Sequence, residues 1–177
     1  MRRIEVVAAV IIREGRVLAA QRAGGPFDGG WEFPGGKRET GDASEEAALC
    51  REIREELAAD IKVGELLCRV EYDYPDFHLS MGCFICTLAP GGREPQRSEH
   101  AALRWLEARQ LNEVTWLPAD VEAVARVREY LSAAGRATSV APAPEPSCRP
   151  KIQTQATTSG RSVMSGSMLF LIGVYSV

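Results

Sequence analysis

The alternation of hydrophobic and polar positions divides the first part of the chain into strands. Residues 4–13 form a nearly unbroken apolar run, which is typical of a strand covered on both faces. A Glu14-Gly15 turn signal follows this run, and residues 16–22 (RVLAAQR) then predict a returning strand. The same reasoning predicts further strands at residues 31–34, 61–74, 77–88 and 103–106.

Two segments have the spacing of amphipathic helices. From Ser44 to about Ala58, apolar residues recur every four positions on one face. Ser44 is a suitable N-cap, and two glutamates follow it in the positively polarised first turn. A second helix is predicted over residues 119–133. Its inner face is expected to contain Val121, Val124, Val127 or Arg128, and Leu131.

After residue 135 the composition changes. Residues 136–177 lack periodicity and are rich in Pro, Ser and Thr, so we expect one folded domain at residues 1–135 and a disordered tail. The tail ends in MLFLIGVYSV, which is too short to span a bilayer because a spanning helix needs about 20 apolar residues. This end could be a weak anchor, a partner-binding segment or sequence without a role, and the last alternative is favoured.

Composition and charge exclude some classes of function. The chain has 177 residues, of which 45% are hydrophobic and 25% charged, as in a soluble single-core protein. Residues 1–135 carry 17 basic and 23 acidic residues, which argues against binding of duplex nucleic acid. The opening MRRIEVVAAVII starts like a signal peptide, but Glu5 interrupts it and no cleavage site follows. We therefore expect a cytoplasmic protein with no membrane attachment, and the oligomeric state stays open.

The cysteines and histidines give no independent sign of a metal site. Five cysteines without regular spacing agree with a reducing compartment. Cys83 and Cys86 form a lone CxxC inside a predicted strand, where residues three apart face opposite sides, so a buried structural pair is expected. His78 and His100 are likewise expected to be structural.

The acidic residues are concentrated in one segment. Residues 39–60 hold eight acidic residues and only two basic ones. Glu52 and Glu56 are four positions apart and project from one helix face, with Glu55 on its edge. Taken alone, this pattern fits a solvated helix face. Three carboxylates on one rigid element are, however, also the oxygen ligands that Mg²⁺ prefers.

The sequence around these glutamates resembles the Nudix box. GGKRETGDASEEAALCREIREEL matches that pattern at Gly36 and at the closing run from Arg51 to Glu56, and WEFPGGK just upstream is similar to the MutT-like branch. Eight residues instead of the usual seven separate Asp42 from Arg51, and we assign the extra residue to Ala43. The late glycine of the box is missing, so the helix is expected to run on slightly.

The resemblance implies an α/β fold, with a mixed β-sheet between helices, and hydrolysis of a nucleoside diphosphate linked to another group. It implies Mg²⁺, with Mn²⁺ as a substitute, held by the Gly36 carbonyl and by the glutamates. It also implies that Arg51 holds these carboxylates in position. The charges agree, because a polyphosphate near this acidic segment would be repelled unless divalent cations lay between them. Asp42 is the position that the insertion puts in doubt.

Sites beyond the box follow from the same resemblance. Arg22 matches an arginine that binds substrate phosphate, and Asp120 matches the residue that reads the edge of the base. Glu99 resembles an acid that serves as metal ligand or base, although a solvated loop acid is nearly as good an interpretation. Phe77 stacks on the base or belongs to the core, and Trp116 is expected to be the tryptophan nearest the pocket. The implied catalytic and metal-binding acids are Glu52, Glu55, Glu56 and Glu99.

The leading hypothesis is a Mg²⁺-dependent nucleoside triphosphate pyrophosphohydrolase. It would convert CTP, dCTP or an oxidised nucleotide such as 8-oxo-dGTP to the monophosphate and pyrophosphate. Two alternatives stay open: hydrolysis of ADP-ribose or nucleotide sugars, and a non-catalytic Nudix module that binds nucleotides or a protein partner. The presence of all three helix glutamates argues against the non-catalytic module.

Overall fold

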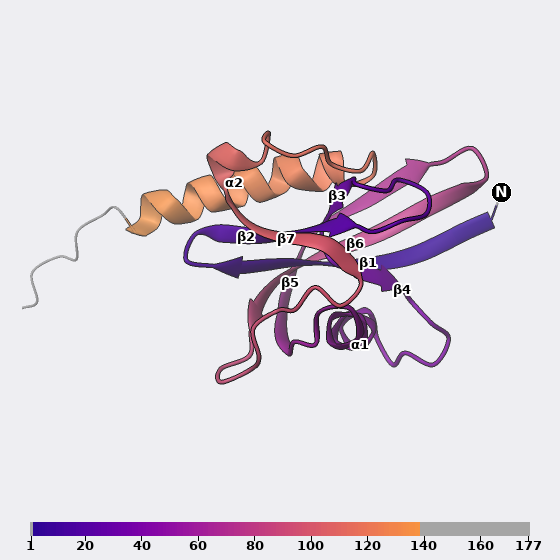
Figure 1. The fold of residues 1–177 in the computed structure, drawn as a ribbon, viewed down its shortest axis with the longest axis horizontal. Helices are drawn as coiled ribbons and strands as arrows, with labels where there is room; N and C mark the ends of the chain where they lie inside the picture. Colours follow the sequence, from indigo (N-terminus) through magenta and orange to yellow (C-terminus); the bar gives the residue numbers. More distant parts are fainter. Residues whose placement is uncertain (1, 139–177) are drawn as a thin grey trace, which may run out of the picture. The chain divides into compact units, whose positions relative to one another are not determined.

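The computed structural model describes residues 2–138 of the chain (Figure 1). The expected tail lies outside the described residues from residue 139 onwards. The last helix, however, continues to Thr138, beyond its predicted end. The strands are β1 (Arg2–Arg13), β2 (Arg16–Arg22), β3 (Trp31–Glu32), β4 (Gly35–Lys37), β5 (Ile61–Asp73), β6 (Phe77–Leu88) and β7 (His100–Glu107), and the helices are α1 (Glu45–Leu57), the 3₁₀-helix η1 (Ala108–Gln110) and α2 (Asp120–Thr138).

The seven strands form one mixed sheet, in which β1 has a central place. β1 runs parallel to β6 from Arg2 to Ile11. On its other side β1 changes partner, because residues 6–8 pair with β4 and residues 12–13 pair with β2. The strands β1 and β2 therefore separate along most of their length, and β4 borders the opening. The observed mixed sheet and flanking helices confirm the α/β fold class.

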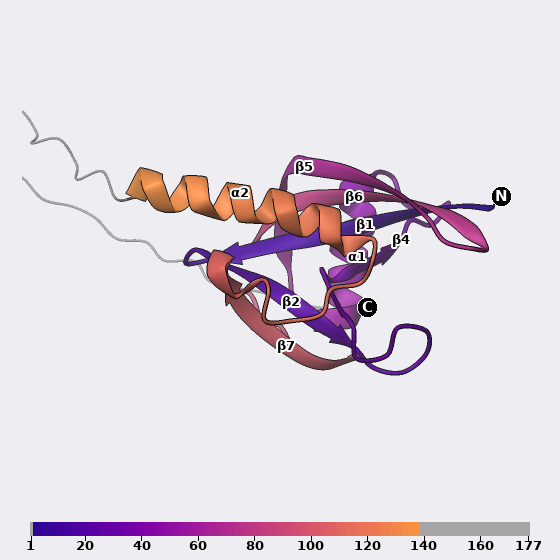
Figure 2. The same ribbon diagram turned by 90° about the horizontal axis from the view of Figure 1, so that it is seen from above.

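The two long helices lie on opposite sides of the sheet (Figures 1 and 2). β1 has buried residues on both faces, as its apolar run predicts: Val7, Ala9 and Ile11 pack in the α1 core, and Ala8 and Val10 in the α2 core. The α1 core includes the helix residues Leu49, Ile53 and Leu57, and the α2 core includes Val124, Val127 and Leu131.

The N-terminal end of α1 agrees with the prediction, whereas its C-terminal end differs. The Ser44 hydroxyl accepts a hydrogen bond from the Ala47 N–H at 3.2 Å, so Ser44 is the N-cap. The expectation that the helix runs on is wrong. It ends at Leu57, because Ala58 adopts a left-handed conformation with φ of 49° and its N–H binds the Arg54 carbonyl. Alanine thus takes the backbone conformation that glycine usually provides at this position.

The inner face of α2 differs from the prediction at its first position. Val121 is 58% exposed, whereas Asp120, Ala123 and Val124 are buried. The helix begins at Asp120. Positions 120, 123, 124, 127 and 131 then share one face, since residues three and four apart are neighbours on a helix. Asp120 is therefore the first residue of the inner face of α2, a position that hydrophobicity alone assigns to Val121.

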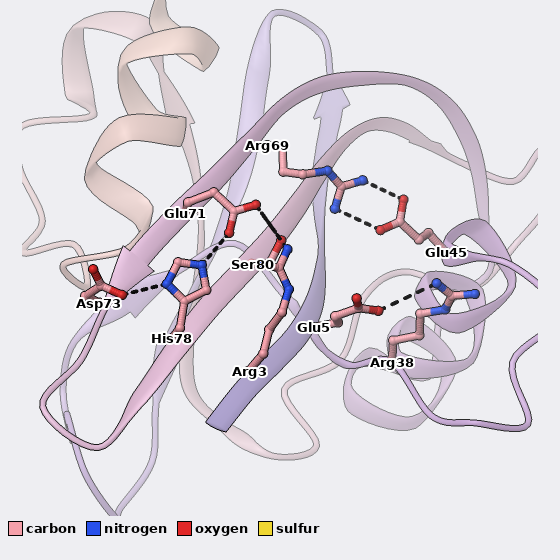
Figure 3. Close-up of polar contacts among 9 residues, drawn as sticks. All are labelled: Arg3, Glu5, Arg38, Glu45, Arg69, Glu71, Asp73, His78 and Ser80. Atoms are coloured by element: carbon pink, nitrogen blue, oxygen red, sulfur yellow. Dashed lines mark hydrogen bonds and ion pairs between the residues drawn. The ribbon is translucent and has the colours of Figure 1, made fainter. Parts of the chain in front are cut away.

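Ion pairs on the α1 side of the sheet fix the start of α1 (Figure 3). Arg69 on β5 donates to both carboxylate oxygens of Glu45, at 3.0 and 2.8 Å. Glu5 on β1 pairs with Arg38, in the segment that connects β4 to α1, at 3.7 Å. These contacts tie the first turn of α1, and the segment that precedes it, to the sheet.

A second polar cluster holds the β5–β6 hairpin (Figure 3). The His78 ring contacts Asp73 at 2.6 Å and Glu71 at 2.7 Å. These two hydrogen bonds raise the pKa of His78. Glu71 also accepts hydrogen bonds from Ser80 at 2.8 Å and from Arg3 at 3.4 Å. His78 therefore joins neighbouring strands at the surface, in keeping with a structural role.

Two other predictions concern the cysteines and membranes. Cys83 and Cys86 are buried on opposite sides of the sheet, Cys83 in the α2 core and Cys86 in the α1 core, as strand alternation predicts. No helix within residues 2–138 is long and apolar enough to cross a membrane.

Candidate active site

A cavity of about 700 Å³ lies where β1 changes partner. Its walls come from β1, β4, α1, the β5–β6 hairpin and the start of α2. One part of the wall is acidic, with glutamates from α1, and another is apolar. The apolar part includes Ile4, Val6, Phe27, Phe33, Tyr74, Phe77, Leu79, Met81 and Leu117.

Arg51 organises the acidic part of the wall. Its Nη1 donates to Glu52 at 2.9 Å and to Glu55 at 3.2 Å, and its Nη2 donates to the Lys37 carbonyl at 3.1 Å. Because the guanidinium offers donors in a fixed planar fork, one side chain can hold several acceptors in a defined arrangement. Both glutamates line the cavity beside Arg51.

Asp42 lies behind Arg51 instead of in the cavity wall. Its two carboxylate oxygens accept from Arg51 Nε at 3.2 Å and Nη2 at 3.0 Å, and Oδ2 also accepts the Glu39 N–H at 2.8 Å. The hydrogen bond from Arg51 holds the pKa of Asp42 below its ordinary value. The loop before α1 thus directs Asp42 to the arginine, where it completes the set of groups around the guanidinium.

Glu56 is largely enclosed: 18% of its side chain is exposed, compared with 13% for Glu52 and 57% for Glu55. Its Oε2 accepts the Gly35 N–H at 3.1 Å. Burial raises the pKa of Glu56 to about 7, while nearby His100 acts in the opposite direction. Any cation near Glu56 would favour its ionised form, because opposite charge stabilises a carboxylate.

His100, the neighbour of Glu99, lies beside two glutamates of the cavity wall without lining the cavity itself. The His100 side chain is only 5% exposed, and its Nε2 lies 3.7 Å from Glu32 and 4.0 Å from Glu56. Glu99 is exposed and is not part of the cavity wall within the described residues. β7 begins at His100, and its pairing with β2 shifts register between Gln21 and Arg22. Strand alternation alone therefore does not predict the side on which His100 lies.

The donor set at the acidic end fits a hard divalent cation. It contains only oxygen donors, which Mg²⁺ prefers over nitrogen or sulfur. A Cβ at Gly36 would collide with the Glu52 carboxylate, so glycine lets this carboxylate lie against the backbone. Within residues 2–138, no three acidic, histidine or cysteine side chains already converge on one metal position. Glu52 and Glu55 turn toward Arg51 instead.

Asp120 is a buried carboxyl group in the cavity wall. Its Oδ1 accepts the Phe33 N–H at 3.0 Å. Burial raises the pKa of Asp120 to about 8, so the group is mostly protonated at pH 7. In that form it keeps one hydroxyl donor as well as acceptor capacity. The geometry suits recognition of a polar edge on an otherwise flat, apolar ligand.

Aromatic side chains stand near Asp120. Tyr74 and Phe77 are stacked, with ring centroids 4.7 Å apart and an interplanar angle of 26°, and Phe27 lies 5.6 Å from Tyr74. All three line the cavity. None of the three tryptophans lines the cavity, and Trp116 packs one layer behind its wall. The Trp116 N–H donates to the Leu111 carbonyl, and the ring packs against Phe33 at 4.8 Å.

Arg22 stands at the end of β2, where its Nη1 donates to Glu32 at 2.8 Å. Both residues line the cavity. The structure therefore gathers most of the residues that the sequence suggested and leaves out Glu99. Those in the cavity wall are Arg22, Gly36, Glu52, Glu55, Glu56, Phe77 and Asp120. Sequence reasoning missed the nearby Phe27, Glu32, Tyr74 and His100.

Comparisons with known proteins agree with this arrangement. Residues 1–127 match the model of the NUDIX domain. The chain is 36% identical over 134 residues to the CTP pyrophosphohydrolase of Escherichia coli, which covers 68% of this chain and 88% of that protein. It is 39% identical over 88 residues to the 8-oxo-dGTP diphosphatase of Proteus vulgaris, which covers 49% and 78% respectively.

A solved structure gives the same result. The solution structure of the Nudix hydrolase MutT from methicillin-resistant Staphylococcus aureus 252 matches with a TM-score of 0.58 and 34% identity. The match covers 73% of this chain and 99% of that one. Together with the family match over most of the chain and the box residues gathered at one cavity, this similarity leads to one conclusion: the chain belongs to the Nudix hydrolase family and is MutT-like.

Proposed function

We propose that this protein is a Mg²⁺-dependent nucleoside triphosphate pyrophosphohydrolase. Its substrate would be CTP, dCTP or an oxidised nucleotide such as 8-oxo-dGTP, and its products the nucleoside monophosphate and pyrophosphate. The relatives whose names specify these substrates support the choice of nucleotide class.

One observation carries the proposal. A single cavity has an acidic wall and an apolar wall, and the apolar wall contains one buried carboxyl group, that of Asp120. Glu52, Glu55 and Glu56 lie in the acidic wall, and Asp120 lies in the apolar one. A nucleotide has the same division, because its triphosphate is strongly anionic while its base is flat and largely apolar with a polar edge. The cavity volume of about 700 Å³ is within the range of small-molecule sites.

The division of tasks follows from the positions. The three glutamates and the Gly36 carbonyl would hold Mg²⁺, which would polarise the phosphate oxygens and lower the pKa of the attacking water. Arg51 keeps Glu52 and Glu55 oriented, and the carboxylates supply an acceptor for the water proton. Arg22 stands at the cavity to bind phosphate, and its pairing with Glu32 fixes the guanidinium.

Base recognition falls to the apolar wall. The stacked Tyr74 and Phe77 provide an aromatic surface against which a base can pack. Asp120 offers a hydroxyl donor when protonated and accepts from an exocyclic amine when ionised. Because its pKa of about 8 lies near working pH, both forms are accessible to the bound base.

A substrate panel tests the proposal. The purified full chain is incubated with Mg²⁺ and with CTP, dCTP, 8-oxo-dGTP, the other nucleoside triphosphates, ADP-ribose or a nucleotide sugar. We expect pyrophosphate and the monophosphate from at least one triphosphate, and loss of activity when the cation is chelated. Hydrolysis restricted to ADP-ribose or nucleotide sugars would contradict the proposal, and so would nucleotide binding without turnover.

A further inference from the structure

Two cysteines face each other across the strand pair β5–β6. In the antiparallel register, Cys68 on β5 lies directly opposite Cys83 on β6. Both belong to the core on the α2 side of the sheet, and their thiols are hydrogen-bonded to each other. The nucleotide chemistry proposed above uses neither residue.

The spacing of this pair is suitable for a disulfide. Directly opposed residues in an antiparallel pair have Cα atoms about 4.5 to 5.5 Å apart. A disulfide requires a Cα separation of about 4.4 to 6.8 Å. Cys86 is on the opposite side of the sheet, and Cys50 belongs to α1 on that same opposite side. Among the described cysteines, Cys68 and Cys83 are thus the pair that strand register holds in opposition.

The two thiols differ in accessibility. Cys83 is completely buried, whereas Cys68 is partly exposed. Cys68 lines a second cavity of about 590 Å³ between β5 and α2, whose wall includes Arg126 together with Glu122 and Glu129. A small solute can therefore reach Cys68 from this cavity, while Cys83 stands behind it.

The two thiols also differ in acidity. The hydrogen bond with Cys68 and the burial of the thiol raise the pKa of Cys83. The same hydrogen bond lowers the pKa of Cys68, and it outweighs the burial and the Glu122 carboxylate, which act in the opposite direction. The proton shared by the pair thus favours the buried sulfur. The accessible sulfur carries more thiolate character, which is the nucleophilic form of cysteine.

We propose that Cys68 and Cys83 form a peroxide-reactive thiol pair, with Cys68 as the attacking sulfur and Cys83 as the resolving one. The Cys68 thiolate attacks the terminal oxygen of a hydroperoxide, the O–O bond breaks, and Cys68 becomes a sulfenic acid. The other oxygen leaves as hydroxide or alkoxide and takes up a proton from water. The Cys83 sulfur then attacks the Cys68 sulfur and displaces its oxygen, which leaves as water. The two thiols lose two electrons together, and the peroxide gains them. A dithiol reductant, itself oxidised to a disulfide, returns both cysteines to thiols.

Mass spectrometry of the full chain tests this pair. The reduced protein is treated with hydrogen peroxide, alkylated and digested with trypsin. We expect the peptide of residues 63–69, which contains Cys68, to be joined to the peptide of residues 70–93, which contains Cys83. Because Cys86 lies in the second peptide, the Cys86→Ser variant identifies the partner without ambiguity. Treatment with a dithiol should restore both free peptides.

The order of reaction needs two further variants. In Cys83→Ser, Cys68 should accumulate as a sulfenic acid that dimedone traps, whereas Cys68→Ser should leave Cys83 reduced. Cys50→Ser with Cys148→Ser is the control and should keep the disulfide. If wild-type protein keeps both thiols in peroxide, or if Cys68 joins a different cysteine, the pair is not the reactive unit. The wild-type measurement decides this even if one variant does not fold.

Discussion

At the scale of single residues, Arg51 carries the most contacts in the acidic wall. It donates to Asp42, Glu52, Glu55 and the Lys37 carbonyl. Asp42 occupies one part of this network and is not itself part of the cavity wall. Asp42 therefore has a positioning role. Its substitution should affect activity less than substitution of a residue that contacts the substrate.

We predict that Asp42→Asn lowers kcat by at most about tenfold, since Arg51 keeps its bonds to both glutamates. Arg51→Lys should cost more, because an ammonium group cannot reproduce the planar fork. Steady-state kinetics of both variants at saturating Mg²⁺ provide the comparison. A loss in Asp42→Asn as large as that in Arg51→Lys would mean that Asp42 acts directly on the metal or substrate.

The position of Asp120 predicts an effect on selectivity among nucleotide bases. Because it lies in the apolar wall, Asp120→Ala should change the ratio of kcat/KM for CTP to that for 8-oxo-dGTP. The same measurements on dCTP show whether the sugar contributes. An equal fall for all three substrates would show that Asp120 does not read the base.

The raised pKa of Asp120 also predicts that the stability of the protein depends on pH. Its pKa is raised from 3.8 to about 8 in the folded protein, so folding takes up a proton between these values. Its contribution to stability is present at low pH and is lost as pH rises through about 8. Asp120→Asn should therefore reduce the fall in unfolding free energy between pH 5.5 and pH 8.5, measured with urea. Glu56 contributes with the same sign and leaves a residual slope. An unchanged pH dependence in Asp120→Asn would contradict the raised pKa.

At the scale of elements, α1 could be predicted almost completely. Its apolar spacing, its N-cap and its box residues identify the buried and acidic faces, and the structure agrees. The end of the helix could not be predicted, because sequence alone does not show that Ala58 adopts a left-handed conformation. β4 was missed for a similar reason: it is three residues long and contains two glycines.

The left-handed conformation of Ala58 predicts the sign of the change in unfolding free energy when this residue is replaced by glycine. Ala58→Gly should raise the free energy of unfolding by about 1 kcal/mol, because a left-handed conformation is strained for a residue with a Cβ. Urea unfolding of the wild type and the variant is the measurement. If Ala58 were instead interior to a longer helix, glycine would lower stability by about 1 kcal/mol, which is the opposite sign.

At the scale of the whole molecule, long-range pairing brings the site together. Box motifs and apolar patterns predict which residues matter on α1, but not that β1 leaves β2 for β4 and opens a cavity there. Nor do they show that β7 places His100 beside Glu56. Aromatic residues such as Phe27 and Tyr74 enter the wall through loop and hairpin geometry, for which local sequence holds little information.

The central claim is that the glutamates of α1 act on a nucleotide through a divalent cation, and Glu52→Gln tests it most directly. This change keeps the side-chain volume and removes the charge.

The matched control is Glu65→Gln, on β5, where the glutamate is exposed and outside the described cavity wall. The measurement is pyrophosphate release at saturating Mg²⁺ from the triphosphate that the wild type prefers, with melting temperature as the check on folding. We predict that Glu52→Gln loses at least about 100-fold in kcat, which is about 2.7 kcal/mol of transition-state stabilisation, while it stays folded and Glu65→Gln keeps full activity. Near wild-type turnover in a folded Glu52→Gln protein would contradict the assignment of this cavity as the active site.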